Sequence, residues 1–148
     1  MTAKGKFEYK SMKSALDLVR RGDPKGFAVV RLHLTDTYKS HGGYTDDDRV
    51  KFSDGIMADV ISIASDKWIE NAARKIRAAV GFSQQNPEYG KMIAGYFPGA
   101  GNTDEWFQWE YREHGVDVSV VNTKKFRQWL SRKYKSLASL FTREWMSL

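Results

Sequence analysis

Cationic and aromatic side chains are interleaved near the end of the chain, where residues 122–148 carry seven lysines and arginines and one acid, Glu144. Cations at this density can neutralise phosphates, and aromatic rings can stack on nucleic-acid bases. Phe126, Trp129 and Tyr134 belong to an apolar stripe at helical spacing, so we expect these rings to face the core and the cations to face a ligand. The cations are Lys124, Lys125, Arg127, Arg132, Lys133 and Lys135.

The first 25 residues form a second basic segment, with seven cations against three acids, and they include Arg20 and Arg21. The 96 residues between the two segments carry ten cations and fourteen acids, within a chain whose net charge is +6. Two basic ends that pack together present one continuous electropositive region to an anionic partner. We expect that arrangement, and we add Arg20 and Arg21 to the predicted nucleic-acid-binding residues.

Arg31, His33 and Thr35 alternate along a predicted strand, which places them on one face. A histidine for proton transfer would then lie beside a guanidinium that can bind an anionic oxygen. The triplet that starts at His33 also resembles one half of the paired H-x-T signature of two-histidine phosphoesterases, while the triplet at His114 lacks the final hydroxyl. A phosphodiesterase or nuclease-like enzyme that uses His33, with His114 brought near, is therefore an alternative hypothesis.

Three acids, Asp46, Asp47 and Asp48, follow His41 closely, and carboxylates with an imidazole could bind a metal ion. Their spacing fits neither a calcium-binding loop nor a zinc-binding helix, and acids are expected in the first turn of a helix. We therefore predict no metal site. The glycine-rich run over 95–103 lacks the lysine of a phosphate-binding loop, and nothing in the sequence predicts a cofactor.

Glycines and prolines interrupt residues 82–103, which predicts a long connection without regular structure. Tyr89, Tyr96 and Phe97 would be exposed there, and aromatic side chains on a mobile loop can anchor a protein interface. An inhibitor or adaptor module that binds a protein through this loop is the second alternative hypothesis.

Periodicity predicts the elements that position these residues. Apolar residues at helical spacing indicate a helix over 11–22 and a long central helix that follows the acids at 46–48 and ends at Val80. Gly55 could divide this pattern into a short turn and a main helix from near Asp54 to Val80. Apolar and polar residues alternate over 27–34, which indicates a half-buried strand. Alternation over 106–121 favours a hairpin, with a helix capped by Asn102 as the competing interpretation.

The last predicted helix is basic and amphipathic, and Asn122 and Thr123 are its expected caps. The order of elements predicts an α+β fold. In that fold a small antiparallel sheet, made of the strand over 27–34 and the hairpin over 106–121, packs against the central helix and the C-terminal helix.

Composition limits the class of protein. The chain has 148 residues, 41% of them hydrophobic, which excludes a disordered or fibrous chain and predicts a single globular domain over 1–148. The chain has no cysteine and no run apolar enough to span a membrane, so we expect a cytoplasmic protein without a disulfide framework. Our leading hypothesis is a non-enzymatic basic domain that binds nucleic acid, DNA or RNA, through its phosphates. An acidic protein surface is the other anionic partner that we consider, and we expect no membrane partner.

Overall fold

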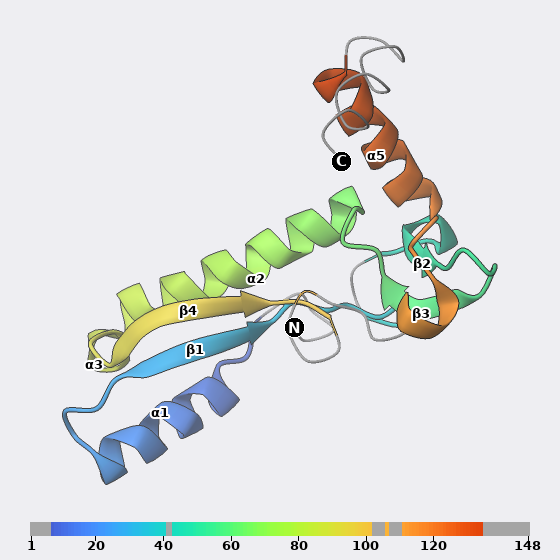
Figure 1. Ribbon diagram of the computed structural model, residues 1–148. Helices are drawn as coiled ribbons and strands as arrows, with labels where there is room; N and C mark the ends of the chain where they lie inside the picture. The colour runs from blue at the N-terminus through green and yellow to red at the C-terminus, as the bar shows by residue number, and fades with distance from the viewer. Residues whose placement is uncertain (1–6, 41–42, 102–105, 107–110, 135–148) are drawn as a thin grey trace, which may run out of the picture.

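The computed structural model describes residues 7–40, 43–101, 106 and 111–134 (Figure 1). It has an α+β fold with small two-stranded sheets. The elements in chain order are α1 (Lys10–Gly22), β1 (Ala28–His33), the 3-10 helix η1 (Asp46–Asp48), β2 (Arg49–Lys51), β3 (Met57–Ile61), α2 (Asp66–Gln85), α3 (Pro87–Gly90), β4 (Ile93–Gly99), α4 (Tyr111–His114) and α5 (Val120–Lys133).

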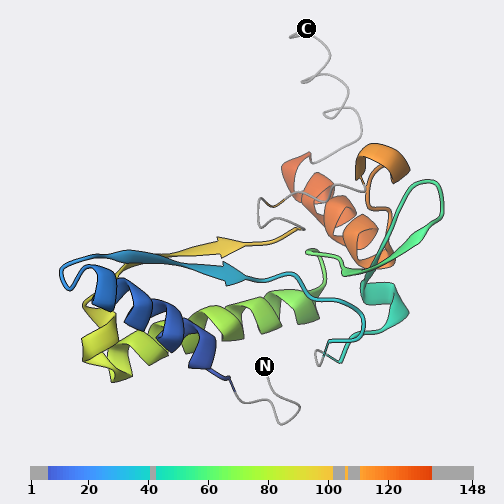
Figure 2. The ribbon, with the colours of Figure 1, turned by 90° about the horizontal axis from the view of Figure 1, so that it is seen from below.

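The first sheet pairs β1 with β4 in parallel, with Val30 beside Tyr96 and Arg31 beside Phe97. Figure 2 shows α1 and α2 on the same side of both strands. Side chains of β1 alternate accordingly, since Val30 is half-buried while Val29 is 65% exposed. The alternation in the sequence therefore predicted this strand correctly, and the predicted helix over 11–22 is confirmed as α1.

The core lies where the end of β1 meets α2. Its buried residues are Leu34, Tyr44, Ile61, Trp68, Ala72 and Ala100. The Trp68 indole N–H donates to the carbonyl oxygen of Leu34 at 3.0 Å, which gives this buried polar group a partner. The Ser65 hydroxyl accepts the Trp68 amide and so caps α2, which begins at Asp66.

The predicted helix from Asp54 to Val80 is wrong over residues 54–65. Strands β2 and β3 pair there as an antiparallel hairpin, and the Phe52 amide donates to the Ile56 carbonyl at 2.8 Å across its turn. Gly55 makes this turn possible because its φ of +94° lies in the left-handed region that glycine tolerates. The helix starts later than predicted and also ends later, at Gln85.

The predicted hairpin over 106–121 is wrong where the structure describes it. Residues 111–114 form α4, and Ser119 caps α5, which begins two residues before the predicted cap at Asn122. Residues 107–110 lie outside the described part of the chain. Because β1 pairs with β4 instead, the sheet that contains β1 is parallel, not antiparallel as predicted.

Residues 82–103 are also more ordered than predicted, although 102–103 lie outside the described residues. Helix α2 continues into this segment, and α3 and β4 follow. A side chain at Gly90 would meet the Ser83 carbonyl oxygen at 2.5 Å, so glycine lets α3 approach α2 closely. Gly90 therefore serves close packing and does not mark a loop, while Gly95 lies within β4 with no atom within 4 Å of its Cβ position.

Candidate nucleic-acid interface

Helix α5 carries a dense and unbalanced positive charge. Five lysines and arginines lie between Val120 and Lys133 with no acid among them, and no residue of α5 is buried. Lys124, Arg127 and Arg132 are exposed. The Arg132 Nε donates to the backbone carbonyl of Gln128, one turn earlier, at 3.2 Å, and this neutral acceptor does not offset the guanidinium charge. Such a surface attracts the phosphates of a polyanion.

Two aromatic side chains of α5 are more exposed than the sequence predicts. Phe126 and Trp129 are 56% and 45% exposed, and their rings stack with centroids 5.8 Å apart and an interplanar angle of 21°. Lys133 places its ammonium 4.7 Å from the Trp129 ring centroid. Of the three predicted core rings, Tyr134 alone is buried, and it meets Trp129 edge-on.

The prediction that Phe126 and Trp129 face the core is wrong for a physical reason. Helix α5 packs against η1 and points away from the sheet of β1 and β4 (Figure 1). Its apolar stripe therefore has no sheet beneath it within the described residues. Both rings are therefore accessible from solvent.

Asp117 anchors the start of α5 to the β2–β3 hairpin. Its carboxylate accepts the Ser119 amide at 2.8 Å and the Ser62 hydroxyl at 2.7 Å. Its backbone carbonyl accepts the Asn122 side-chain amide at 2.6 Å, and the next residue, Val118, donates its amide to the carbonyl oxygen of β2 at Lys51. These contacts of Asp117 and Val118 hold the start of α5 against the hairpin.

A second anchor joins α5 to the N-terminus of α2. Lys125 Nζ lies 2.5 Å from an Asp66 carboxylate oxygen, in the first turn of α2. An acid at that position is also favoured by the helix dipole. Of the five α5 cations, Lys125 therefore has its charge partly compensated within the protein.

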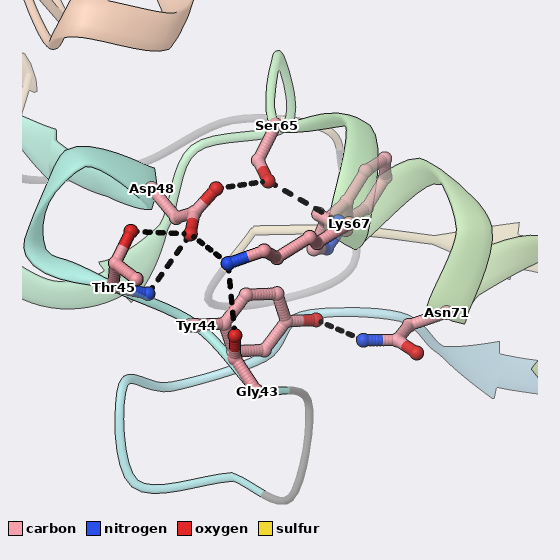
Figure 3. A network of polar contacts seen from close by, with 8 residues as sticks. Gly43, Tyr44, Thr45, Asp48, Ser65, Lys67 and Asn71 are labelled. Carbon is pink, nitrogen blue, oxygen red and sulfur yellow. Dashed lines mark hydrogen bonds and ion pairs between the residues drawn. The ribbon is translucent and has the colours of Figure 1, made fainter.

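The buried carboxylate of Asp48 stabilises the start of α2 (Figure 3). Thr45 donates both its amide and its hydroxyl to Asp48, each at 2.9 Å. The Ser65 hydroxyl donates at 2.7 Å, and Lys67 Nζ lies 3.1 Å from Asp48 while donating to the Gly43 carbonyl at 2.9 Å. The network thus connects the loop before η1 to the cap of α2.

These contacts set the charge state of Asp48. Burial alone would raise the pKa of this carboxyl, but the hydrogen bonds from Thr45, Ser65 and Lys67 outweigh burial and lower the pKa from 3.8 to about 2. Asp48 is therefore a permanent anion at neutral pH. The sequence predicted Asp48 as an acid in the first turn of a helix, and in the structure the Thr45-x-x-Asp48 spacing forms a capping box at the start of η1.

Tyr44 and Asp36 form a neighbouring buried pair, in which the phenol donates to the carboxylate. Lys75 Nζ lies 2.6 Å from Asp36, and the Asn71 side chain donates to the Tyr44 oxygen at 2.9 Å. Burial, followed by the bond to Asp36, raises the pKa of Tyr44 above its ordinary value of 10. The phenol stays protonated at neutral pH, so it serves as a donor within the core and not as a base. The sequence alone does not reveal this cluster, because Lys75 and Asn71 are 39 and 27 residues away from the acid and the phenol that they bind.

The described parts of the two basic ends, α1 and α5, do not converge. Figures 1 and 2 place α1 and α5 at opposite ends of the molecule. Arg20 and Arg21 are exposed near the end of α1, where Arg20 lies 2.6 Å from Asp17 and over the Tyr89 ring. The expected single electropositive region is therefore wrong for α1 and α5, and Lys135 lies outside the described residues.

The three aromatic residues predicted for a protein-binding loop do not share a surface loop. Tyr89 packs on Phe82, and its hydroxyl donates to Asp17 at 3.2 Å. Tyr96 points toward α2, because its hydroxyl donates to the Ala79 carbonyl at 2.9 Å. Phe97 is the exposed member, at 47%.

The predicted phosphodiesterase residues lie in two places. Arg31, His33 and Thr35 line a groove of about 710 Å³ between α1, β1 and α2, and the Thr35 hydroxyl donates to the Gly101 carbonyl at 2.9 Å. His114 belongs to α4 at the other sheet, where its Nδ1 lies 2.8 Å from the Asp54 carboxylate. The groove lining therefore does not include a second histidine.

Within the residues that the structure describes, no helix has the length and apolarity that a membrane crossing requires. Nor do three histidine or acidic side chains of those residues gather as metal ligands would. Comparisons of the chain with protein-family models, with curated proteins and with solved structures find no match. The functional assignment therefore depends on the geometry of α5 itself.

Proposed function

We propose that the protein binds nucleic acid through the phosphates that lie along α5. The observation that carries this proposal is a 14-residue helix with five cations, no acid and no buried residue. Phosphate contacts supply most of the affinity of such surfaces, while base edges supply sequence specificity. We therefore expect affinity that falls steeply with salt and depends weakly on sequence.

The cations contribute unequally. Lys124, Arg127 and Arg132 are exposed and carry charge that the described structure does not offset, so they make the main phosphate contacts. Lys125 is half-buried and its charge is shared with Asp66, so its contribution is smaller. Arg20 and Arg21 lie at the other end of the molecule and do not belong to this interface (Figure 1).

Charge reversal tests the proposal. The variant Lys124→Glu, Arg127→Glu, Arg132→Glu lowers the net charge from +6 by six, to zero. A matched control, Arg20→Glu, Arg21→Glu, Lys25→Glu, lowers the net charge by the same amount at the other end of the molecule. Binding is measured by fluorescence anisotropy of a labelled oligonucleotide, and folding of each variant by circular dichroism.

The α5 variant is expected to lose binding by at least tenfold while it stays folded, because exposed surface substitutions cost little stability. The control is expected to bind within a few-fold of the wild type. Equal weakening in both variants would mean that overall charge, and not α5, governs binding. A folded α5 variant with wild-type affinity would refute the interface.

A further inference from the structure

We infer that the α5 surface selects single-stranded over double-stranded nucleic acid, through the exposed ring pair of Phe126 and Trp129. This inference rests on the proposed function and deepens it, because it names the class of nucleic acid. Proteins that bind single strands without sequence preference combine a positive surface with aromatic rings on which bases stack. Helix α5 carries both features on one element.

The two rings form a preassembled stacking platform. They lie three residues apart on consecutive turns, so the helix places them on one side. Their near-parallel arrangement, with centroids 5.8 Å apart, needs no rearrangement before a base adds to the outer face of the pair. The buried ring of Tyr134 meets Trp129 edge-on at 6.3 Å, a contact that helps to hold the Trp129 ring in place.

Positive charge lies on the same side of the helix as this platform. The Lys133 ammonium lies 4.7 Å from the Trp129 ring centroid and 4.9 Å from that of Tyr134. Arg132 follows Trp129 by three residues in α5, a spacing that places both on one side of the helix. A base stacked on the rings would therefore bring its phosphates among positive side chains. This charge complementarity favours a nucleic-acid strand over an uncharged apolar partner for the exposed rings.

A duplex cannot use the platform in the same way. Its bases are stacked on one another and paired, so their faces are closed to a protein ring unless a base is unstacked at a cost of a few kcal/mol. A duplex would therefore gain the phosphate contacts of α5 but not the stacking. The preference for single strands should then depend on the rings and not on the cations.

The test compares one oligonucleotide as a single strand and as a duplex with its complement, bound to the full chain under the same salt. Trp129→Leu removes the aromatic face, and Trp129→Phe restores one. Val120→Ala is the matched control, because Val120 is an apolar residue of the same helix and is 60% exposed. Vesicles of anionic lipid serve as a separate probe of membrane affinity.

The wild type is expected to bind the single strand more tightly than the duplex. Stacking is worth about 1–3 kcal/mol per base, so Trp129→Leu should weaken single-strand binding by about 5- to 150-fold and leave duplex binding unchanged. Trp129→Phe should recover most of the loss, and Val120→Ala should have no effect.

Two results would overturn the inference, and they are distinguishable. Equal binding of single strand and duplex, both unaffected by Trp129→Leu and both lost on charge reversal of α5, would refute the stacking role and leave the proposed function standing. Absence of binding to either oligonucleotide would refute both, and vesicle binding that depends on Trp129 would then assign the rings to a lipid surface.

Discussion

Asp48 is a buried carboxylate that stabilises the first turn of α2, the segment that contacts α5. It accepts hydrogen bonds from Thr45, Ser65 and Lys67, and its neighbours in the network position the first turn of α2. Asp66 in that turn binds Lys125 of α5. The ionisation of Asp48 is therefore linked to the stability of the whole region.

We predict that Asp48→Asn loses stability mainly at neutral pH. The pKa of Asp48 is about 2 in the folded protein against 3.8 ordinarily. A depressed pKa stabilises the fold above the unfolded value, and this stabilisation disappears as the pH falls through the folded value. The shift corresponds to about 2 kcal/mol at pH 7.

Urea unfolding between pH 7 and pH 2 measures this effect. The difference between wild type and Asp48→Asn should be largest at pH 7 and should narrow as the pH falls from about 4 toward 2. Asp47→Asn, an exposed acid in the same turn, serves as the control and should stay within about 0.5 kcal/mol of the wild type. A constant difference across this pH range would argue against the role assigned to the Asp48 charge.

At the scale of elements, the β2–β3 hairpin is one part of the fold that periodicity predicted wrongly. Residues 56, 57, 60 and 61 are apolar, which fits helical spacing as well as two faces of a strand. The turn at Asp54-Gly55 decides between these structures. The Asp54 carboxylate accepts the Ile56 amide at 3.0 Å, and Gly55 adopts a positive φ.

We predict that Gly55→Ala destabilises the protein by about 1–2 kcal/mol, the cost of a left-handed backbone for a residue with a Cβ. No atom lies within 4 Å of the Cβ position, so the loss would come from the backbone alone. Gly22→Ala is a matched control, because its Cβ position is equally open and its φ is not positive. Thermal unfolding measures the stability that each variant loses relative to the wild type. An equal loss in the two variants would contradict the turn assigned to Gly55.

Local signals therefore predicted some elements and failed for others. Helix α1 and strand β1 have clean periodicity, and the structure confirms both. Strand β4 contains glycines and a proline, and its pairing with β1 forms across more than 60 residues of sequence, which no local pattern reports. The basic character of α5 was predictable, whereas the exposure of Phe126 and Trp129 was not, because periodicity identifies an apolar stripe but not what covers it.

At the scale of the whole molecule, the positions of the charged residues matter more for binding than the net charge does. A net charge of +6 and two basic ends suggested one binding region, but α1 and α5 lie at opposite ends (Figures 1 and 2). Exposed charges separated by more than about 10 Å are largely screened at ordinary salt. The ends therefore act separately, and the proposed interface is confined to the α5 end.

The dependence of affinity on salt tests this localisation most directly. The slope of the logarithm of affinity against the logarithm of salt concentration reports how many phosphates the protein neutralises. The measurement is the Kd for a labelled single strand between low and moderate salt, for the wild type and for Lys124→Ala, Arg127→Ala, Arg132→Ala. Each lost contact lowers the slope by about 0.7, so we expect the triple variant to lower it by about 2. A triple variant whose slope equals that of the wild type would contradict the account.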